Sequence, residues 1–180
     1  SYTVGKRTDY TAISVVSLDY KNVWYVRDCY RARLDVPGVV EAIFRMVRLY
    51  RPTLVGMQGV DWNRFFKSVL QAEMRKRNEF FNVKELPTYS VNTKGLGSKN
   101  SRIARLSPYY NSGSIIHIKE ARGLKEYESE LLAFPNSKFD DLSDCAAMHI
   151  DLVFGAPEKR IEKSYYEEED EGEVNKISGY

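Results

Sequence analysis

Two runs of β-branched and aromatic residues near the start of the chain set the strongest limit on its fold. They cover residues 10–18 and 22–30, and only the short polar stretch from Asp19 to Lys21 separates them. Two such runs with a short polar break predict an antiparallel β-hairpin. The chain is therefore expected to contain a β-sheet.

Helical and extended patterns alternate after this hairpin. Apolar side chains recur at helical spacing in VPGVVEAIFRMVRLYRP, where Pro52 is expected to stop the helix. Residues 53–57 read as a short buried strand, residues 61–80 as an amphipathic helix with a basic end, and residues 81–91 as another extended segment. The order β-β-α-β-α-β predicts an α/β fold, with a mixed central sheet flanked by helices.

The next segment is rich in Gly, Ser and basic residues. NTKGLGSKNSRIARLSPYYNSGSIIHI predicts a mobile loop, a short basic helix, a turn at Ser107–Pro108 and a strand at residues 114–118. KGLGSKNS lacks the spacing of a phosphate-binding loop, so a flexible basic loop is favoured over an ATP site. Residues 124–134 predict a short helix, and a last helix is expected to start near Phe139.

Length and composition favour one compact, soluble domain. The chain has 180 residues, of which 43% are apolar, enough for a sizeable core, and it shows neither a membrane-spanning run nor a signal peptide. Cys29 and Cys145 are far apart and neither belongs to a CxxC pair, so both are expected to be small core residues. His117 and His149 are expected to be structural residues with satisfied partners.

Charge is distributed unevenly along the chain. Residues 158–180 carry eight acids and four bases, so the overall charge of +2 leaves +6 for residues 1–157. The chain is thus expected to divide into a folded domain at 1–157 and an acidic, disordered tail at 158–180. A basic body is compatible with a polyanionic partner and equally with an ordinary soluble surface.

A cluster of aspartates precedes the last apolar segment. In FPNSKFDDLSDCAAM, Asp140, Asp141 and Asp144 fall within one helical turn, so their carboxylates can converge. One interpretation is that Asp140 and Asp141 complement the helix dipole while Ser137 caps the helix. The other is a Mg²⁺ or Mn²⁺ site, because the apolar residues that follow would hold this turn against a sheet edge.

Four stretches together resemble a known family. YRPTLVGM, KNSRIARLSPYYNSGSI, YESELLAFP and FDDLSDCAAM, in this order, are similar to the C-terminal nuclease domain of the large terminase subunit of tailed bacteriophages. The resemblance covers most of residues 9–153 and implies a ribonuclease H-like fold with an added basic loop or hairpin segment. It also implies an endonuclease that cuts double-stranded DNA with two divalent ions, Mg²⁺ or Mn²⁺. Asp140 matches the metal-binding acid of the last helix, with Asp141 and Asp144 as auxiliary ligands.

The sequence departs from this family at two of its principal acids. The first family acid ends a strand before a loop resembling GKRTDYTAI, and because the chain starts at Ser1 that strand is expected to be missing or replaced. Asp9 matches a second aspartate often seen after the loop. Gln58 stands where the family has its second acid, and Asp61 could substitute only if the turn brings it back. A weakened or inactive nuclease is therefore one expectation.

The resemblance also implies partners. The residues expected to contact duplex DNA are Lys94, Lys99, Arg102 and Arg105. The other implied partners are the terminase ATPase domain, the portal protein and the small terminase subunit, in the host cell cytoplasm and without a membrane. Two alternatives stay open. One is another ribonuclease H-like nuclease such as a resolvase, against which the Ser-Pro segment argues, and the other is a non-catalytic DNA-binding or portal-docking module.

Overall fold

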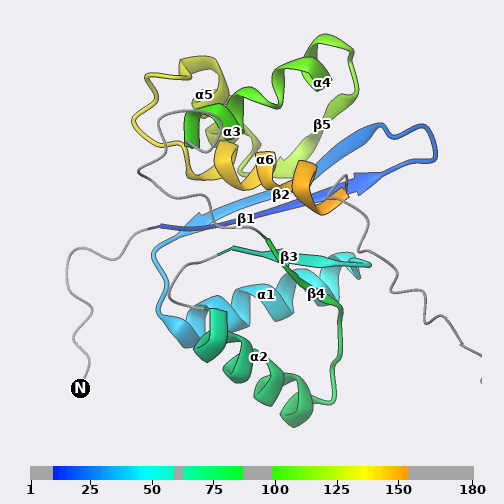
Figure 1. Cartoon of the computed structure of the whole chain (residues 1–180), viewed down its shortest axis with the longest axis vertical. Helices are drawn as coiled ribbons and strands as arrows, with labels where there is room; N and C mark the ends of the chain where they lie inside the picture. Colours follow the sequence, from blue (N-terminus) through cyan, green and yellow to red (C-terminus); the bar gives the residue numbers. More distant parts are fainter. Residues whose placement is uncertain (1–9, 59–62, 87–98, 154–180) are drawn as a thin grey trace, which may run out of the picture.

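The fold is built on a mixed three-stranded sheet. The computed structural model describes residues 10–58, 63–86 and 99–153. Within them, β1 (Thr11–Leu18), β2 (Trp24–Ala32) and β5 (Ile115–Arg122) hydrogen-bond in the order β1-β2-β5 (Figure 1). β1 and β2 are antiparallel, whereas β2 and β5 are parallel. The predicted hairpin and the α/β class are confirmed.

The hairpin turn is explained by one side chain. The carboxylate of Asp19 accepts hydrogen bonds from the backbone N–H groups of Lys21 at 2.8 Å and Val23 at 2.9 Å. Asn22 adopts a positive φ of 59°, a conformation that Asn tolerates better than most residues. The short polar break between the two apolar runs therefore encodes the turn locally.

A second, smaller sheet lies beside the first one. α1 (Val36–Tyr50) leads into β3 (Val55–Met57), and α2 (Asn63–Arg77) leads into β4 (Val83–Glu85), which pairs in parallel with β3. The Asp35 side chain caps α1 by accepting from the Gly38 N–H at 2.9 Å. Both helices lie on the same side of the large sheet (Figure 1). The strands were expected to form one central sheet, but the described residues form two separate hydrogen-bonded sheets.

The remaining helices cover the opposite face of the large sheet. They are α3 (Lys99–Ala104), α4 (Ser107–Asn111), α5 (Leu124–Ala133) and α6 (Asp141–Val153) (Figure 1). The predicted turn at Ser107–Pro108 is wrong, because these residues begin α4. Proline suits the first turn of a helix, where its missing N–H leaves no hydrogen bond unmade.

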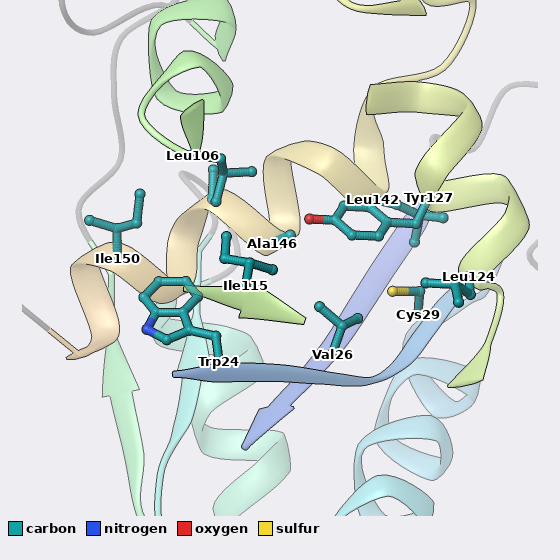
Figure 2. Close-up of a cluster of buried hydrophobic side chains, with 11 residues drawn as sticks. Trp24, Val26, Cys29, Leu106, Ile115, Leu124, Tyr127, Leu142, Ala146 and Ile150 are labelled. Atoms are coloured by element: carbon teal, nitrogen blue, oxygen red, sulfur yellow. The ribbon is translucent and has the colours of Figure 1, made fainter. Parts of the chain in front are cut away.

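Two apolar clusters stabilise the two faces. The first joins β2, α5 and α6, where Trp24 and Val26 project from the sheet toward Ala146 and Ile150 (Figure 2). The second joins α1 and α2, with Ile13 of β1 and Met57 of β3 packed against it. Its buried members are Val40, Ile43, Phe44, Phe66, Leu70 and Met74. Cys29 belongs to the first cluster, as predicted, and both cysteines are free thiols.

The sequence predicted an acidic tail and no membrane-spanning segment. The acidic segment 158–180 lies outside the described residues, so the division at residue 157 stays a prediction. None of the helices in the described ranges has the length and apolar character needed to cross a bilayer.

Candidate functional site

A cavity of about 1240 Å³ separates the two sheets. All of β1 lines one side and all of β3 lines the other, while α1 and α2 form one wall and α6 forms the opposite wall. Within the described residues, β1 pairs only with β2 and β3 pairs only with β4. Each of these two strands therefore has an edge that is unpaired in the described part of the chain.

The start of α6 brings two of the predicted aspartates to one cation. The Lys99 ammonium donates to the carboxylate of Asp140 at 2.7 Å and to that of Asp141 at 3.3 Å. Both aspartate side chains are partly exposed, at 39% and 27%. Burial opposes the charged form of Lys99, but its bonds to Asp140 and Asp141 outweigh that effect and raise its pKa.

The third aspartate has a different environment. Asp144 is buried and forms a bidentate pair with Arg102, with Nε–Oδ1 and Nη2–Oδ2 distances of 2.6 and 2.7 Å. The two side chains are only 10% and 9% exposed. This geometry fixes α3 against α6 and directs the Asp144 oxygens toward Arg102.

The bases predicted to contact DNA are therefore paired with the acids of α6. Arg105, one turn beyond Arg102, forms a similar bidentate pair with Asp151 at 2.7 and 3.2 Å. Lys99 and Arg102 lie on α3 and Arg105 follows it directly, which confirms the predicted short basic helix. Lys94 lies outside the described residues.

Gln58 shares the cavity with the acids of α6. It follows β3 directly and lines the cavity together with Asp141 and Asp144. Glu85, the last residue of β4, also lines the cavity and was not recognised in the sequence. The only signal for it was its place at the end of a short extended segment. Asp9 and Asp61 lie outside the described residues.

The described carboxylates do not by themselves fit the pair of divalent ions that the resemblance implies. Within residues 10–58, 63–86 and 99–153, no three His, Cys, Asp or Glu side chains converge as a metal site. Asp140 and Asp141 point to Lys99, and Asp144 points to Arg102. Divalent ions of this kind need several oxygen ligands around one centre.

The first turn of α6 is capped from another helix. Glu130 of α5 accepts hydrogen bonds from the backbone N–H groups of Leu142 and Ser143, both at 2.9 Å, and pairs with Arg31. Burial raises the pKa of Glu130, against the lowering effects of these bonds. Glu130 therefore performs the capping that the dipole interpretation assigned to Ser137.

A neutral polar cluster lies on the α6 side of β1. The Ser14 hydroxyl lies 2.9 Å from His149 Nε2 and 3.3 Å from the Cys145 sulfur. Burial lowers the pKa of His149 to about 4 and raises the pKa of the Cys145 thiol. Cys145 is therefore held as a thiol at neutral pH, and His149, with its lowered pKa, is a weak general base for the Ser14 hydroxyl.

This cluster predicts a loss of stability in acid. His149 has a lowered pKa in the folded chain, so its contribution is complete above the unfolded pKa of about 6.5 and is lost as the pH falls toward 4. We expect up to about 3 kcal/mol of destabilisation over this range from this residue. Urea unfolding at pH 7 and pH 4.5 should show a smaller pH effect in His149→Gln than in the unmodified chain. Equal pH effects in His149→Gln and in the unmodified chain would show that His149 does not cause the loss of stability in acid.

The second histidine also has satisfied partners, as predicted. His117 Nδ1 lies 2.7 Å from Glu128, and its Nε2 lies 2.8 Å from the Tyr110 hydroxyl. Tyr110 in turn contacts Tyr127 at 2.8 Å between their hydroxyl oxygens. Both histidines therefore join secondary structure elements through their side chains, and neither contacts the aspartates at the start of α6.

Neither a known protein family nor any curated protein sequence matches the chain.

Proposed function

We propose that this chain is a nuclease domain of the large terminase type, which cuts double-stranded DNA during viral genome packaging. The observation that carries the proposal is that Asp141, which contacts the same lysine as its neighbour Asp140, lines the same cavity as Gln58 and Glu85. Gln58 follows β3 and Glu85 ends β4, and these two strands are parallel. In α/β proteins, sites form beyond the carboxyl ends of parallel strands.

The ribonuclease H-like architecture is part of this proposal. The resemblance implies a first strand that ends before the loop resembling GKRTDYTAI. The cavity between β1 and β3, each of which has an edge without a partner strand in the described part of the chain, supports this assignment, because a strand in that position would pair with both edges. The partners that the proposal implies are duplex DNA, the terminase ATPase domain, the portal protein and the small terminase subunit.

Asp140 is the acid to which we assign the largest role. It is the most exposed of the three aspartates at the start of α6, and it contacts a lysine that is itself 37% exposed. Asp144, by contrast, is buried against Arg102. We therefore assign Asp140 and Asp141 to the site and Asp144 to holding α3 on α6.

A plasmid cleavage assay tests the proposal. Supercoiled DNA is incubated with the chain in Mg²⁺, in Mn²⁺ or in EDTA, and nicked and linear products are measured. We expect cutting only with a divalent ion, its loss in Asp140→Ala and its increase in Gln58→Glu, which adds the charge that the family has there. Asp151→Ala is the matched control, because Asp151 also pairs with a base, Arg105, but lies near the end of α6 instead of at its start.

One outcome would favour a second function. If neither ion gives cutting and Gln58→Glu does not restore it, the nuclease proposal fails and a non-catalytic DNA-binding or portal-docking module is favoured. The observation on the side of this alternative is the pairing of the α6 acids with Lys99, Arg102 and Arg105. Cutting with a specificity for branched DNA would instead favour a resolvase. The Ser-Pro segment was expected to argue against a resolvase. That argument no longer holds, because the segment is helical.

A further inference from the structure

The positive charges available to a polyanion lie away from α3. Lys99, Arg102 and Arg105 are already neutralised by carboxylates of α6. A phosphate group would have to displace these carboxylates before it could bind there, and for Arg102 the displaced carboxylate is buried. Exposed arginines that form no ion pair within the described residues are therefore better placed to bind a polyanion.

Two such arginines lie on β2 and on α1. Arg27 of β2 and Arg45 of α1 are exposed, and neither forms an ion pair within the described residues. Arg27 lies over the Tyr25 ring at 6.0 Å and donates to Ser17 at 3.1 Å. Arg45 lies over the Tyr30 ring at 5.1 Å.

A third arginine joins the same group. The guanidinium of Arg122, from β5, lies 4.8 Å from the centre of the Tyr30 ring, so Tyr30 contacts both Arg45 and Arg122. Arg122 is 42% exposed and is held by the buried carboxylate of Asp28 at 2.9 Å. Asp28 also accepts from the Tyr50 hydroxyl at 2.9 Å. Arg122 is thus paired with one buried acid, whereas Arg27 and Arg45 have no ion pair within the described residues, which leaves an excess of positive charge.

We propose that this surface, formed by Tyr25, Arg27, Tyr30, Arg45 and Arg122 and here named the arginine–tyrosine face, binds the phosphate backbone of duplex DNA. The choice of duplex DNA rests on the proposed function. Guanidinium groups suit phosphate oxygens, and their contacts with tyrosine rings reduce the conformational freedom lost on binding. The tyrosine rings are partly covered by the arginines, which favours contact with phosphates over stacking with bases.

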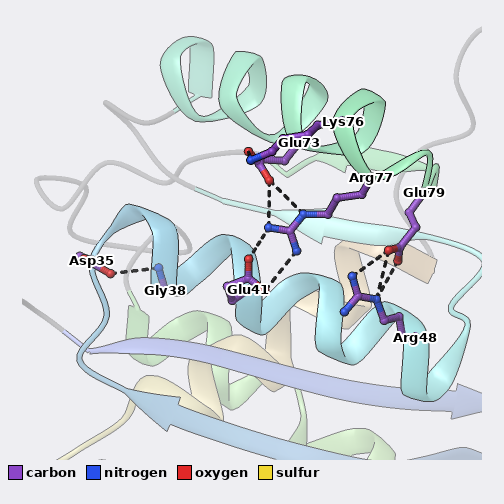
Figure 3. A network of polar contacts seen from close by, with 8 residues as sticks. All are labelled: Asp35, Gly38, Glu41, Arg48, Glu73, Lys76, Arg77 and Glu79. Carbon is purple, nitrogen blue, oxygen red and sulfur yellow. Dashed lines mark hydrogen bonds and ion pairs between the residues drawn. The ribbon is translucent and has the colours of Figure 1, made fainter.

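The chain offers a matched control for this surface. Arg48 and Arg77 are also arginines of α1 and α2, but acids of the same helices and of the segment after α2 neutralise them (Figure 3). Arg48 pairs with Glu79 at 2.7 Å, and Arg77 pairs with both Glu41 and Glu73. Removing these two arginines changes the net charge as much as removing Arg27 and Arg45.

Fluorescence anisotropy with a short labelled DNA duplex tests the inference. Binding is measured in EDTA between about 50 and 200 mM salt, so that no cleavage interferes. We expect Arg27→Gln/Arg45→Gln to weaken binding by roughly tenfold and to reduce the slope of log affinity against log salt by about 2. Arg48→Gln/Arg77→Gln should bind within about twofold of the unmodified chain. Thermal unfolding of each variant checks that it is folded.

The outcomes separate this inference from the nuclease proposal. Equal losses in the two double variants, or no loss in Arg27→Gln/Arg45→Gln, would overturn the assignment of the arginine–tyrosine face. Failure of the unmodified chain to bind duplex DNA at low salt would also overturn it. Binding with the expected variant pattern but without plasmid cleavage would leave this inference standing while the nuclease proposal fails.

Discussion

Gly123→Ala is expected to destabilise the chain by roughly 4 kcal/mol. Gly123 lies between β5 and α5 with a φ of +68°, a conformation that costs an L-residue about 1–2 kcal/mol. A Cβ at this position would also lie 1.8 Å from the Cys29 carbonyl oxygen, which belongs to the backbone of β2. Because neither atom is at the end of a flexible side chain, relief requires movement of the turn or the strand.

Gly113→Ala provides the control for this prediction. Gly113 has the same φ of +68°, but a Cβ there would meet no atom within 4 Å. The Gly113→Ala variant should therefore lose only the stability that the positive φ costs an L-residue, about 1 kcal/mol. The measurement is urea unfolding of both variants beside the unmodified chain. Equal losses in the two variants would show that the close approach of the turn to Cys29 is not rigid.

Arg102→Met is expected to cost about 3–5 kcal/mol, because it leaves the buried carboxylate of Asp144 without its partner. The pair is bidentate, and the side chains of Arg102 and Asp144 are only 9% and 10% exposed. Arg105→Met removes a similar pair on the same side of α6, but the Arg105 side chain is 35% exposed. Its loss should be about 1 kcal/mol or less.

Chemical denaturation of the two single variants measures this difference. The double variant Arg102→Met/Asp144→Leu removes both charges and should recover most of the loss, as replacement of buried ion pairs by apolar residues often does. If Arg102→Met costs no more than Arg105→Met, then Asp144 does not depend on Arg102 in the folded chain. Asp144 would then become available for the metal role that the family resemblance implies.

The elements that were predictable from the sequence are those with local causes. The hairpin turn depends on Asp19 bonding to residues two and four positions later, and α1 has both an apolar stripe and a capping Asp35. Ser107–Pro108 was assigned to a turn because Ser and Pro also favour turns, although Pro108 equally suits the first turn of a helix.

The parts of the candidate site that could not be predicted depend on contacts between distant segments. Lys99 and Arg102 are separated from their aspartates by about forty residues, so the sequence contained no sign that they pair. The bases were therefore assigned to DNA and the acids to metal. The capping of α6 by Glu130 likewise requires α5 and α6 to be adjacent. The separation of the two sheets depends on strand pairing, which the apolar pattern of single strands does not specify.

The cavity between the sheets has a consequence for how the chain loses its structure. It lies between β1 and β3, and the two apolar clusters are centred on opposite sides of the large sheet. We therefore expect the α1–β3–α2–β4 half to open before β2, α5 and α6 lose their own cluster. Cooperativity is weakened when two cores are separated by a cavity, and local opening then precedes global unfolding. A single transition temperature would then describe an average over two units rather than one event.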